Sequence, residues 1–170
     1  LMDAVKHGHL AIAKWLLKQL SKDQKERQLT QPNKEGFTPL MAAVKEGHLA
    51  IAKWIVNQLP EEQRVQQFKG RNKKQFNVMH QAILSGQLEM LKWIVEHLKE
   101  DWKAECEVPN TYGYTALSTL ANNFKKNQRA FGPLVDYLKG KGVGMQACHR
   151  GGGRGVGGKR GRQHSGGGRR

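Results

Sequence analysis

The feature that most constrains this chain is a sequence repeat with a period of 39 residues. The segment MDAVKHGHLAIAKWLL at residues 2–17 returns almost unchanged within GFTPLMAAVKEGHLAIAKWIV at residues 36–56. Trp15, Trp54 and Trp93 occupy one position in three successive copies, and a looser fourth copy begins at NTYGYTAL, one residue early. A fixed period of this kind indicates a stack of small units, each of which buries its apolar face only against its neighbours.

Each copy has the pattern of two helices joined by a tight turn. In the clearest copy, apolar residues recur at spacings of three and four from Leu40 onward, which is the period of an amphipathic helix. Thr38 can cap this helix, Pro39 suits its first turn, and Gly47 can take the left-handed conformation that ends it. Residues 49–59 then form a second amphipathic stretch.

The clearest copy resembles an ankyrin repeat, in which a turn, the motif T-P-L-H-x-A, a glycine and a second helix follow one another. Met41 stands where that motif has histidine, and the matching residues are Thr38, Pro39, Leu40, Ala43, Gly47 and His48. The third copy keeps His80, Ala82 and Gly86 but has Gln75 in place of the turn glycine. The fourth copy keeps Gly113, Thr115 and Leu117 but has no glycine between its helices. The resemblance covers residues 1–138.

The copies are about six residues longer than the roughly 33 residues of an ankyrin repeat. The extra segments are SKDQKERQL at Ser21, PEEQRVQQF at Pro60 and EDWKAECEV at Glu100. The first two begin with a helix-starting residue, carry acids in the first turn and end on an apolar residue. We therefore predict a short third helix in each repeat, packed on the outer side of the stack.

These patterns predict an all-α fold, an ankyrin-type helical solenoid of about four repeats with an extra short helix per repeat and a disordered basic C-terminal tail. We divide the solenoid into residues 1–35, 36–74, 75–112 and 113–138, followed by the tail at 139–170. The chain starts on Leu inside a repeat, so we expect it to be a fragment of a longer protein. It shows no apolar run long enough to cross a membrane.

No motif for catalysis or metal binding is visible. Histidines are frequent, but no pair of them has a carboxylate or thiolate at the spacing of metal ligands. The resemblance implies that His9 and His48 serve packing and hydrogen bonding between repeats. No nucleophile has a recognisable base in a motif, and no phosphate-binding loop occurs. We therefore expect neither an enzyme nor a metal or other cofactor. The recurring tryptophans are more readily explained as core residues than as an exposed ligand-binding ladder.

The remaining candidate is a binding surface. The resemblance implies that the turn tips and the first helix of each repeat line a concave face that binds a partner protein. The residues at these positions are Lys34, Glu35, Phe37, Lys45, Glu46, Lys73, Lys74, Phe76, Leu84, Ser85, Tyr112 and Tyr114, with Thr111, Asn122 and Asn123 in the fourth copy and Lys6 and His7 at the front.

Aromatic residues recur at one position of this face, at Phe37, Phe76 and Tyr114, among lysines. Aromatic anchors beside positive charge suit an acidic or phosphorylated protein segment. The alternative is that these rings brace adjacent turns, and the sequence does not decide between the two.

The tail differs in composition from the repeats: residues 139–170 contain 13 glycines, 9 basic residues and no acidic residue. Such a composition predicts disorder and suits nucleic-acid binding through phosphate contacts. The candidate residues are Arg150, Arg154, Lys159, Arg160, Arg162, Arg169 and Arg170. The abrupt change of composition is equally typical of a shifted reading frame or a cloning junction.

The function expected from the sequence is therefore a non-enzymatic scaffold, a monomer that binds another protein, with nucleic-acid binding through the tail as the alternative. The two widely spaced cysteines, Cys106 and Cys148, argue against a disulfide scaffold and favour a reducing, intracellular compartment, the cytoplasm. Long, Lys/Gln-rich copies resemble secreted effectors of intracellular bacteria, which leaves delivery into a host cell as an alternative location.

Overall fold

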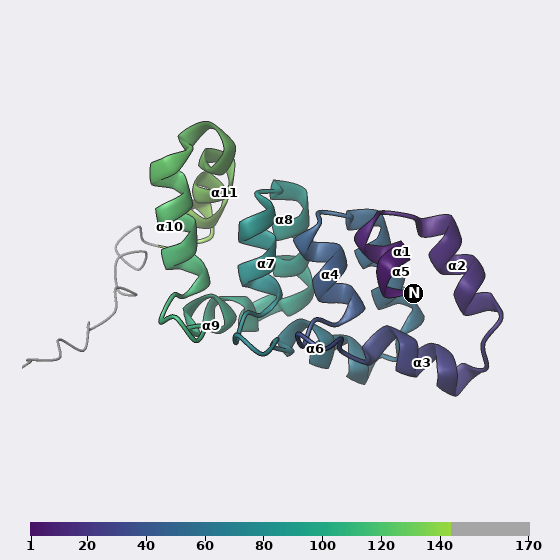
Figure 1. Ribbon diagram of the computed structural model, residues 1–170. Helices are drawn as coiled ribbons and strands as arrows, with labels where there is room; N and C mark the ends of the chain where they lie inside the picture. The colour runs from purple at the N-terminus through teal and green to yellow at the C-terminus, as the bar shows by residue number, and fades with distance from the viewer. Residues whose placement is uncertain (144–170) are drawn as a thin grey trace, which may run out of the picture.

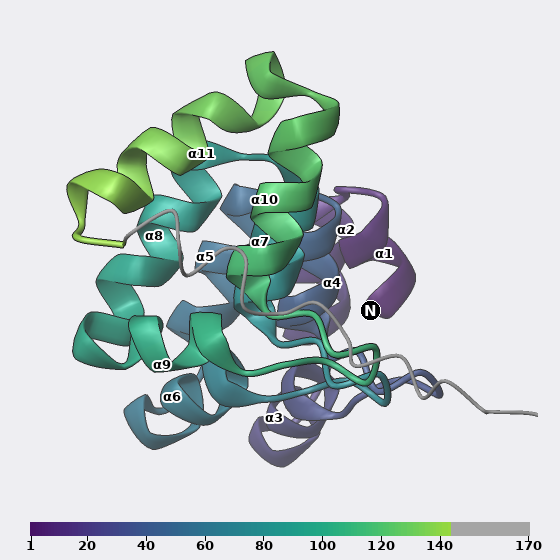
Figure 2. The same cartoon turned by 90° about the vertical axis from the view of Figure 1, so that its left-hand side faces the viewer.

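The structure is a computed structural model that describes residues 1–143, and in these residues all regular structure is helical. The first helices of the repeats lie side by side and form the inner layer: α1 (Met2–Lys6), α4 (Pro39–Lys45), α7 (Val78–Ser85) and α10 (Ala116–Lys126). The second helices form the outer layer behind them: α2 (Leu10–Lys18), α5 (Leu49–Gln58), α8 (Leu88–Leu98) and α11 (Gln128–Gly140) (Figures 1 and 2). The solenoid of helical repeats predicted from the sequence is thus confirmed.

The additional segments are helices, as predicted. They are α3 (Lys22–Thr30), α6 (Glu61–Lys69) and the 3-10 turn η1 (Lys99–Asp101) followed by α9 (Trp102–Glu107). They form a row along one edge of the stack, at the bottom of Figure 1, and contact the next repeat, α3 against α4 and α6 against α8. Ser21 starts α3 through a capping box, because its hydroxyl accepts from the backbone N–H of Gln24 while the Gln24 side chain accepts from the N–H of Ser21.

The turns between the paired helices follow the sequence signals. Thr38 caps α4 by accepting a hydrogen bond from the N–H of Met41, and Gly47 has a positive φ of 79° after that helix. In the fourth repeat, which has no such glycine, α10 continues to Lys126 and Asn127 caps α11 by accepting from the N–H of Ala130. The α11 helix ends at Gly140, two residues past the boundary at which the sequence placed the start of the tail.

The core lies where inner and outer helices of adjacent repeats meet. Leu40, Ile55, Met79, Ile94 and Leu120 come from five helices and are all essentially inaccessible to solvent. Contacts between neighbouring inner helices, α1 to α4 to α7 to α10, run the length of the stack. Each repeat therefore depends on its neighbours for its apolar core, as expected for a solenoid.

The three tryptophans do not behave as one core stripe, and for Trp15 the sequence prediction was wrong. Trp93 is buried against Phe68 of α6, with 5.4 Å between ring centroids, and Trp54 is half-buried beside Leu29 of α3. Trp15 is 61% exposed. The reason is positional: each covered tryptophan packs against the third helix of the preceding repeat, and in the described chain no such helix lies beside Trp15.

Candidate functional site

The loops that precede the inner helices form three turn tips, residues 33–37, 72–76 and 110–114, each opened by an asparagine. The side-chain oxygen of Asn33 accepts hydrogen bonds from the N–H groups of Glu35 and Phe37, both at 2.9 Å. Asn72 binds the N–H groups of Lys74 and Phe76 in the same way. Asn110 repeats the arrangement in the third tip. The asparagine oxygen thus satisfies two backbone donors per tip and fixes the shape of the turn.

Adjacent tips are also joined to each other. The N–H of Lys73 donates to the carbonyl oxygen of Glu35 at 3.1 Å, and the N–H of Thr111 donates to the carbonyl oxygen of Lys74 at 3.1 Å. These bonds place the three tips in a row on the side of the stack that carries the inner helices (Figure 2). The result is a continuous surface made of tips and inner helices.

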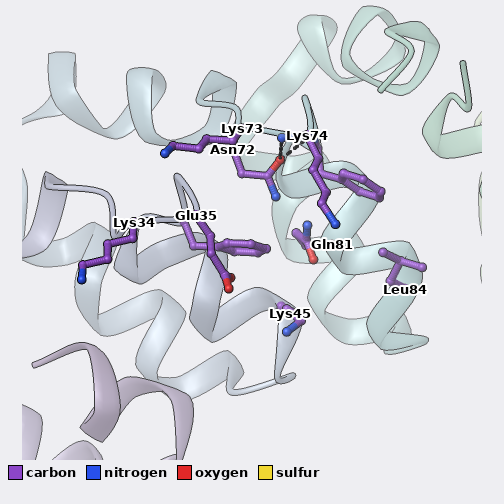
Figure 3. A pocket seen from close by; sticks show the side chains of 10 residues that line it. Lys34, Glu35, Lys45, Asn72, Lys73, Lys74, Gln81 and Leu84 are labelled. Atoms are coloured by element: carbon purple, nitrogen blue, oxygen red, sulfur yellow. Dashed lines mark hydrogen bonds between the residues drawn. The ribbon is translucent and has the colours of Figure 1, made fainter. Parts of the chain in front are cut away.

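A cavity of about 480 Å³ opens on this surface between the first and second tips, over α4 and α7 (Figure 3). We call it the tip cavity. It is lined by Lys34, Glu35, Phe37, Lys45, Asn72, Lys73, Lys74, Phe76, Gln81 and Leu84. Its volume falls within the range of roughly 300–1,000 Å³ that is typical of ligand sites.

The tip cavity brings together eight of the residues that the sequence pointed to: Lys34, Glu35, Phe37, Lys45, Lys73, Lys74, Phe76 and Leu84. The other expected residues lie outside its lining: Glu46, Ser85, Tyr112 and Tyr114, together with Thr111, Asn122, Asn123, Lys6 and His7. The amide-bearing residues Asn72 and Gln81 were missed. A sequence signal existed for both: Asn33, Asn72 and Asn110 recur at the repeat interval, and Gln81 replaces the Ala42 of the preceding copy.

Four of the expected residues outside the lining lie close to it or pair locally. Glu46 forms an ion pair with Lys45, with 3.3 Å between nitrogen and oxygen. The Ser85 hydroxyl donates to the carbonyl oxygen of Ala82 at 2.8 Å and so serves its own helix. Tyr112 packs edge-on against Phe76 with 6.4 Å between ring centroids, and Tyr114 is 43% exposed on the third tip.

The two phenylalanines at the repeated aromatic position contact both the cavity and the side chains packed behind it. Phe37 and Phe76 line the tip cavity, but both are half-buried, Phe37 packing against the core and Phe76 against His80 with 5.3 Å between ring centroids. The Lys45 ammonium lies 5.6 Å from the centroid of the Phe37 ring. The rings therefore both support the tips and form the walls of the cavity.

The rim of the cavity is positively charged. Lys34, Lys45, Lys73 and Lys74 line it together with a single acid, Glu35. Within residues 1–143, the ion pairs involve none of Lys34, Lys73 and Lys74. The Lys74 ammonium instead lies 5.9 Å from the centroid of the Tyr112 ring. An anionic ligand would therefore meet lysines that have no competing carboxylate partner.

Beneath the second tip lies a buried polar network. His80, which is completely buried, places Nδ1 2.7 Å from Asn77 Oδ1 and Nε2 3.0 Å from the carbonyl oxygen of Tyr114 in the third tip. The Asn77 amide donates to the carbonyl and the carboxylate of Glu105, each at 2.8 Å, and Arg71 pairs with that carboxylate at 3.1 Å. This network ties α7, α9 and the third tip into one unit.

Burial is the main cause that lowers the pKa of His80 below its usual value of 6.5, with a smaller lowering from the charge of Arg71. The hydrogen bond to the Tyr114 carbonyl and the charge of Glu105 act in the opposite direction but are outweighed. His80 is therefore a neutral structural histidine near pH 7. His48 links the first two repeats, since its Nε2 lies 3.1 Å from the Lys6 carbonyl oxygen.

The other sequence expectations concern residues outside this surface. The proposed nucleic-acid residues of the tail, Arg150, Arg154, Lys159, Arg160, Arg162, Arg169 and Arg170, all lie outside the described residues. Within residues 1–143 no three histidine, cysteine or acidic side chains gather where they could hold a metal ion. No helix in this range is long and apolar enough to span a bilayer.

The fold and the surface together define the class of protein: a helical repeat solenoid that presents a row of turn tips beside its inner helices. The chain belongs to the ankyrin-repeat family, since the family model of three ankyrin repeats matches residues 1–106. Ankyrin repeats are generally protein–protein interaction modules. Comparison with curated proteins finds no match for this sequence.

Proposed function

We propose that this protein is a non-enzymatic scaffold that binds another protein through its turn tips and inner helices, with the tip cavity at the centre of the interface. The observation that carries the proposal is the cavity itself, which has aromatic walls and a lysine rim and is built from two consecutive repeats. Protein interfaces are typically anchored by a few residues in such pockets, surrounded by contacts that exclude water.

The rigidity of the tips supports the same function. The asparagine oxygens hold each tip, and backbone hydrogen bonds hold neighbouring tips together. A surface that is already ordered before binding loses little conformational entropy when a partner docks. The buried network around His80 adds a further support beneath the second tip.

The proposal is tested by affinity capture of partners with the whole chain and with two variants. Replacing Phe37, Phe76 and Tyr114 together by Ala should abolish capture of those proteins that the unmodified chain retains. Leu84→Ala removes an exposed cavity residue, at 44% exposure, and should weaken capture without a change in the unfolding transition. Val65→Ala, an exposed residue of α6 away from the tips, is the matched control.

Thermal unfolding of each variant separates binding from folding. If the triple variant unfolds at a much lower temperature, Leu84→Ala decides the question, because its side chain is not part of the core. A set of captured proteins that is the same for the unmodified chain, Leu84→Ala and a folded triple variant would contradict the proposed surface. The row of third helices along the edge of the stack would then be the next surface to examine.

A further inference from the structure

The floor of the tip cavity carries a polar group that the protein itself leaves unpaired. Gln81 is only 2% exposed, and its Oε1 is buried without a hydrogen-bond partner. Three other buried side-chain atoms in the described chain also lack a partner, on Gln63, Gln67 and Arg71, but none of these residues lines the cavity. Figure 3 shows the Gln81 side chain between Lys74, Lys45 and Leu84, directed into the space that they enclose.

Packing alone does not require an amide at this position. One repeat earlier the equivalent residue is Ala42, which is equally buried in the same helix position of α4. A buried acceptor without a donor lowers the stability of the folded state. Gln81 is thus a cost to folding that a ligand would remove by donating an N–H or O–H group.

The rest of the cavity restricts what that ligand can be. Its rim carries four lysines and one glutamate, so it favours carboxylates or other anions and disfavours basic segments. Its walls are formed by Phe37, Phe76 and Leu84, so it also favours an apolar side chain. The phosphodiester backbone of DNA supplies the negative charge but neither an apolar side chain nor a hydrogen-bond donor, and the RNA backbone adds a 2′-hydroxyl donor but no apolar side chain.

An extended acidic peptide meets all three requirements. Its backbone supplies the N–H for Gln81 Oε1, one apolar residue enters between the two phenylalanines, and flanking carboxylates meet Lys34, Lys73 and Lys74. We propose that the tip cavity is a subsite for an acidic peptide segment of the partner, in which one apolar anchor residue is flanked by acidic residues. This inference rests on the proposed function, because it assigns the chemistry of the partner to the surface proposed above.

The test begins with a library of random peptides displayed on phage and selected on the whole chain. Peptides with one apolar residue flanked by acidic residues should be enriched. An enriched peptide is then labelled with fluorescein and titrated by fluorescence anisotropy, beside a version in which each Asp and Glu is replaced by its amide. The amide version should bind at least tenfold more weakly at low ionic strength.

Three variants locate the site. Gln81→Leu should weaken binding about tenfold, since it removes one hydrogen bond to the peptide backbone. Its unfolding midpoint should stay the same or rise, because the unpaired buried oxygen is gone. Charge reversal of Lys73 and Lys74 to Glu should weaken binding by a factor of ten or more, and the effect should shrink as salt is added. Reversal of Lys22 and Lys53, exposed lysines on α3 and α5, is the matched control and should have little effect.

The outcomes separate this inference from the proposed function. Enriched peptides that are not acidic, but lose binding in Leu84→Ala, would overturn the inference and leave the proposed function standing. Acidic peptides whose affinity is unchanged in Gln81→Leu and in the Lys73/Lys74 reversal would show that another basic surface binds them, and would overturn the assignment to the tip cavity. If single-stranded nucleic acid displaces the labelled peptide and binds with the same affinity as the peptide, the site does not require a peptide and the inference is contradicted. The absence of any enriched peptide would overturn the inference as well, whereas the capture experiment above tests the proposed function independently of it.

Discussion

The backbone N–H of Lys73 donates a hydrogen bond of 3.1 Å to the carbonyl oxygen of Glu35, which joins the second turn tip to the first. The bond brings the two backbones so close that there is no room for a side chain at Gly36. A Cβ atom at that position would lie 2.7 Å from the Lys73 nitrogen. The spacing of the tips, and with it the width of the tip cavity, therefore depends on the absence of a side chain at Gly36.

Gly36→Ala should accordingly destabilise the protein by about 2–4 kcal/mol. About 1–2 kcal/mol comes from the positive φ, and the remainder from the contact with the neighbouring tip. Gly113 is the matched control, because it has a similar φ of 78° in the third tip but no heavy atom within 4 Å of the position a Cβ would take. Gly113→Ala should cost only about 1–2 kcal/mol in urea unfolding, and equal costs for the two variants would contradict the close approach of the tips.

The packing between repeats predicts a large penalty for truncating a side chain in the middle of the stack. Ile55 of α5 is completely buried, so Ile55→Ala should lower the free energy of unfolding by about 2–5 kcal/mol. Val65→Ala on the exposed side of α6 should change it by less than about 0.5 kcal/mol. Chemical denaturation measures both, and similar midpoints would be inconsistent with the core described here.

A second cavity, of about 270 Å³, lies on the outer side of the first two repeats and is lined by Leu29 and Trp54. Leu29 holds the position that Phe68 holds one repeat later, where the phenylalanine ring packs on Trp93. Leu29→Phe should fill part of this space and stabilise the protein by about 0.5–1 kcal/mol. The reciprocal change Phe68→Leu should open the same space beside Trp93 and cost about 1–2 kcal/mol, measured as a shift of the thermal midpoint. The two changes in stability should have opposite signs. A loss of stability in both variants would show that the space beside Leu29 does not accommodate a larger side chain.

The buried His80 makes the stability of the fold depend on pH. Because burial lowers its pKa below 6.5 in the folded protein, the unfolded chain takes up a proton at this residue at a higher pH than the folded chain does. The contribution of the neutral side chain is therefore present above about pH 6.5 and is lost as the pH falls below that value. His80→Gln should flatten the dependence of the unfolding free energy on pH in this range.

The control for this prediction is Ile55→Ala, which lowers stability without removing a titratable group. It should keep the slope between pH 7 and pH 5 that the unmodified protein shows, at a lower overall stability. A slope that is the same in His80→Gln and in the unmodified protein would show that His80 does not carry the dependence.

The amino-acid sequence by itself determined the local structure and the repeat architecture. Caps such as Ser21 and Thr38 and turn glycines such as Gly47 act within a few residues, so the pattern around them was sufficient to place the helices. The third helices of the first three repeats followed from the same local rules. The residues of the turn tips and inner helices could also be predicted, because a fixed period assigns equivalent positions to equivalent places in a stack.

What only the tertiary structure decided is how equivalent positions differ. Trp15, Trp54 and Trp93 are identical in sequence but range from exposed to buried, because the exposure of each depends on the third helix of the preceding repeat. The unpaired oxygen of Gln81 and the tip-to-tip bond from Lys73 to Glu35 likewise arise between segments that are distant in the chain. Local patterns fix the conformation of each repeat, whereas burial, hydrogen-bond pairing and cavities are properties of the contacts between repeats, and those contacts exist only after the stack has assembled.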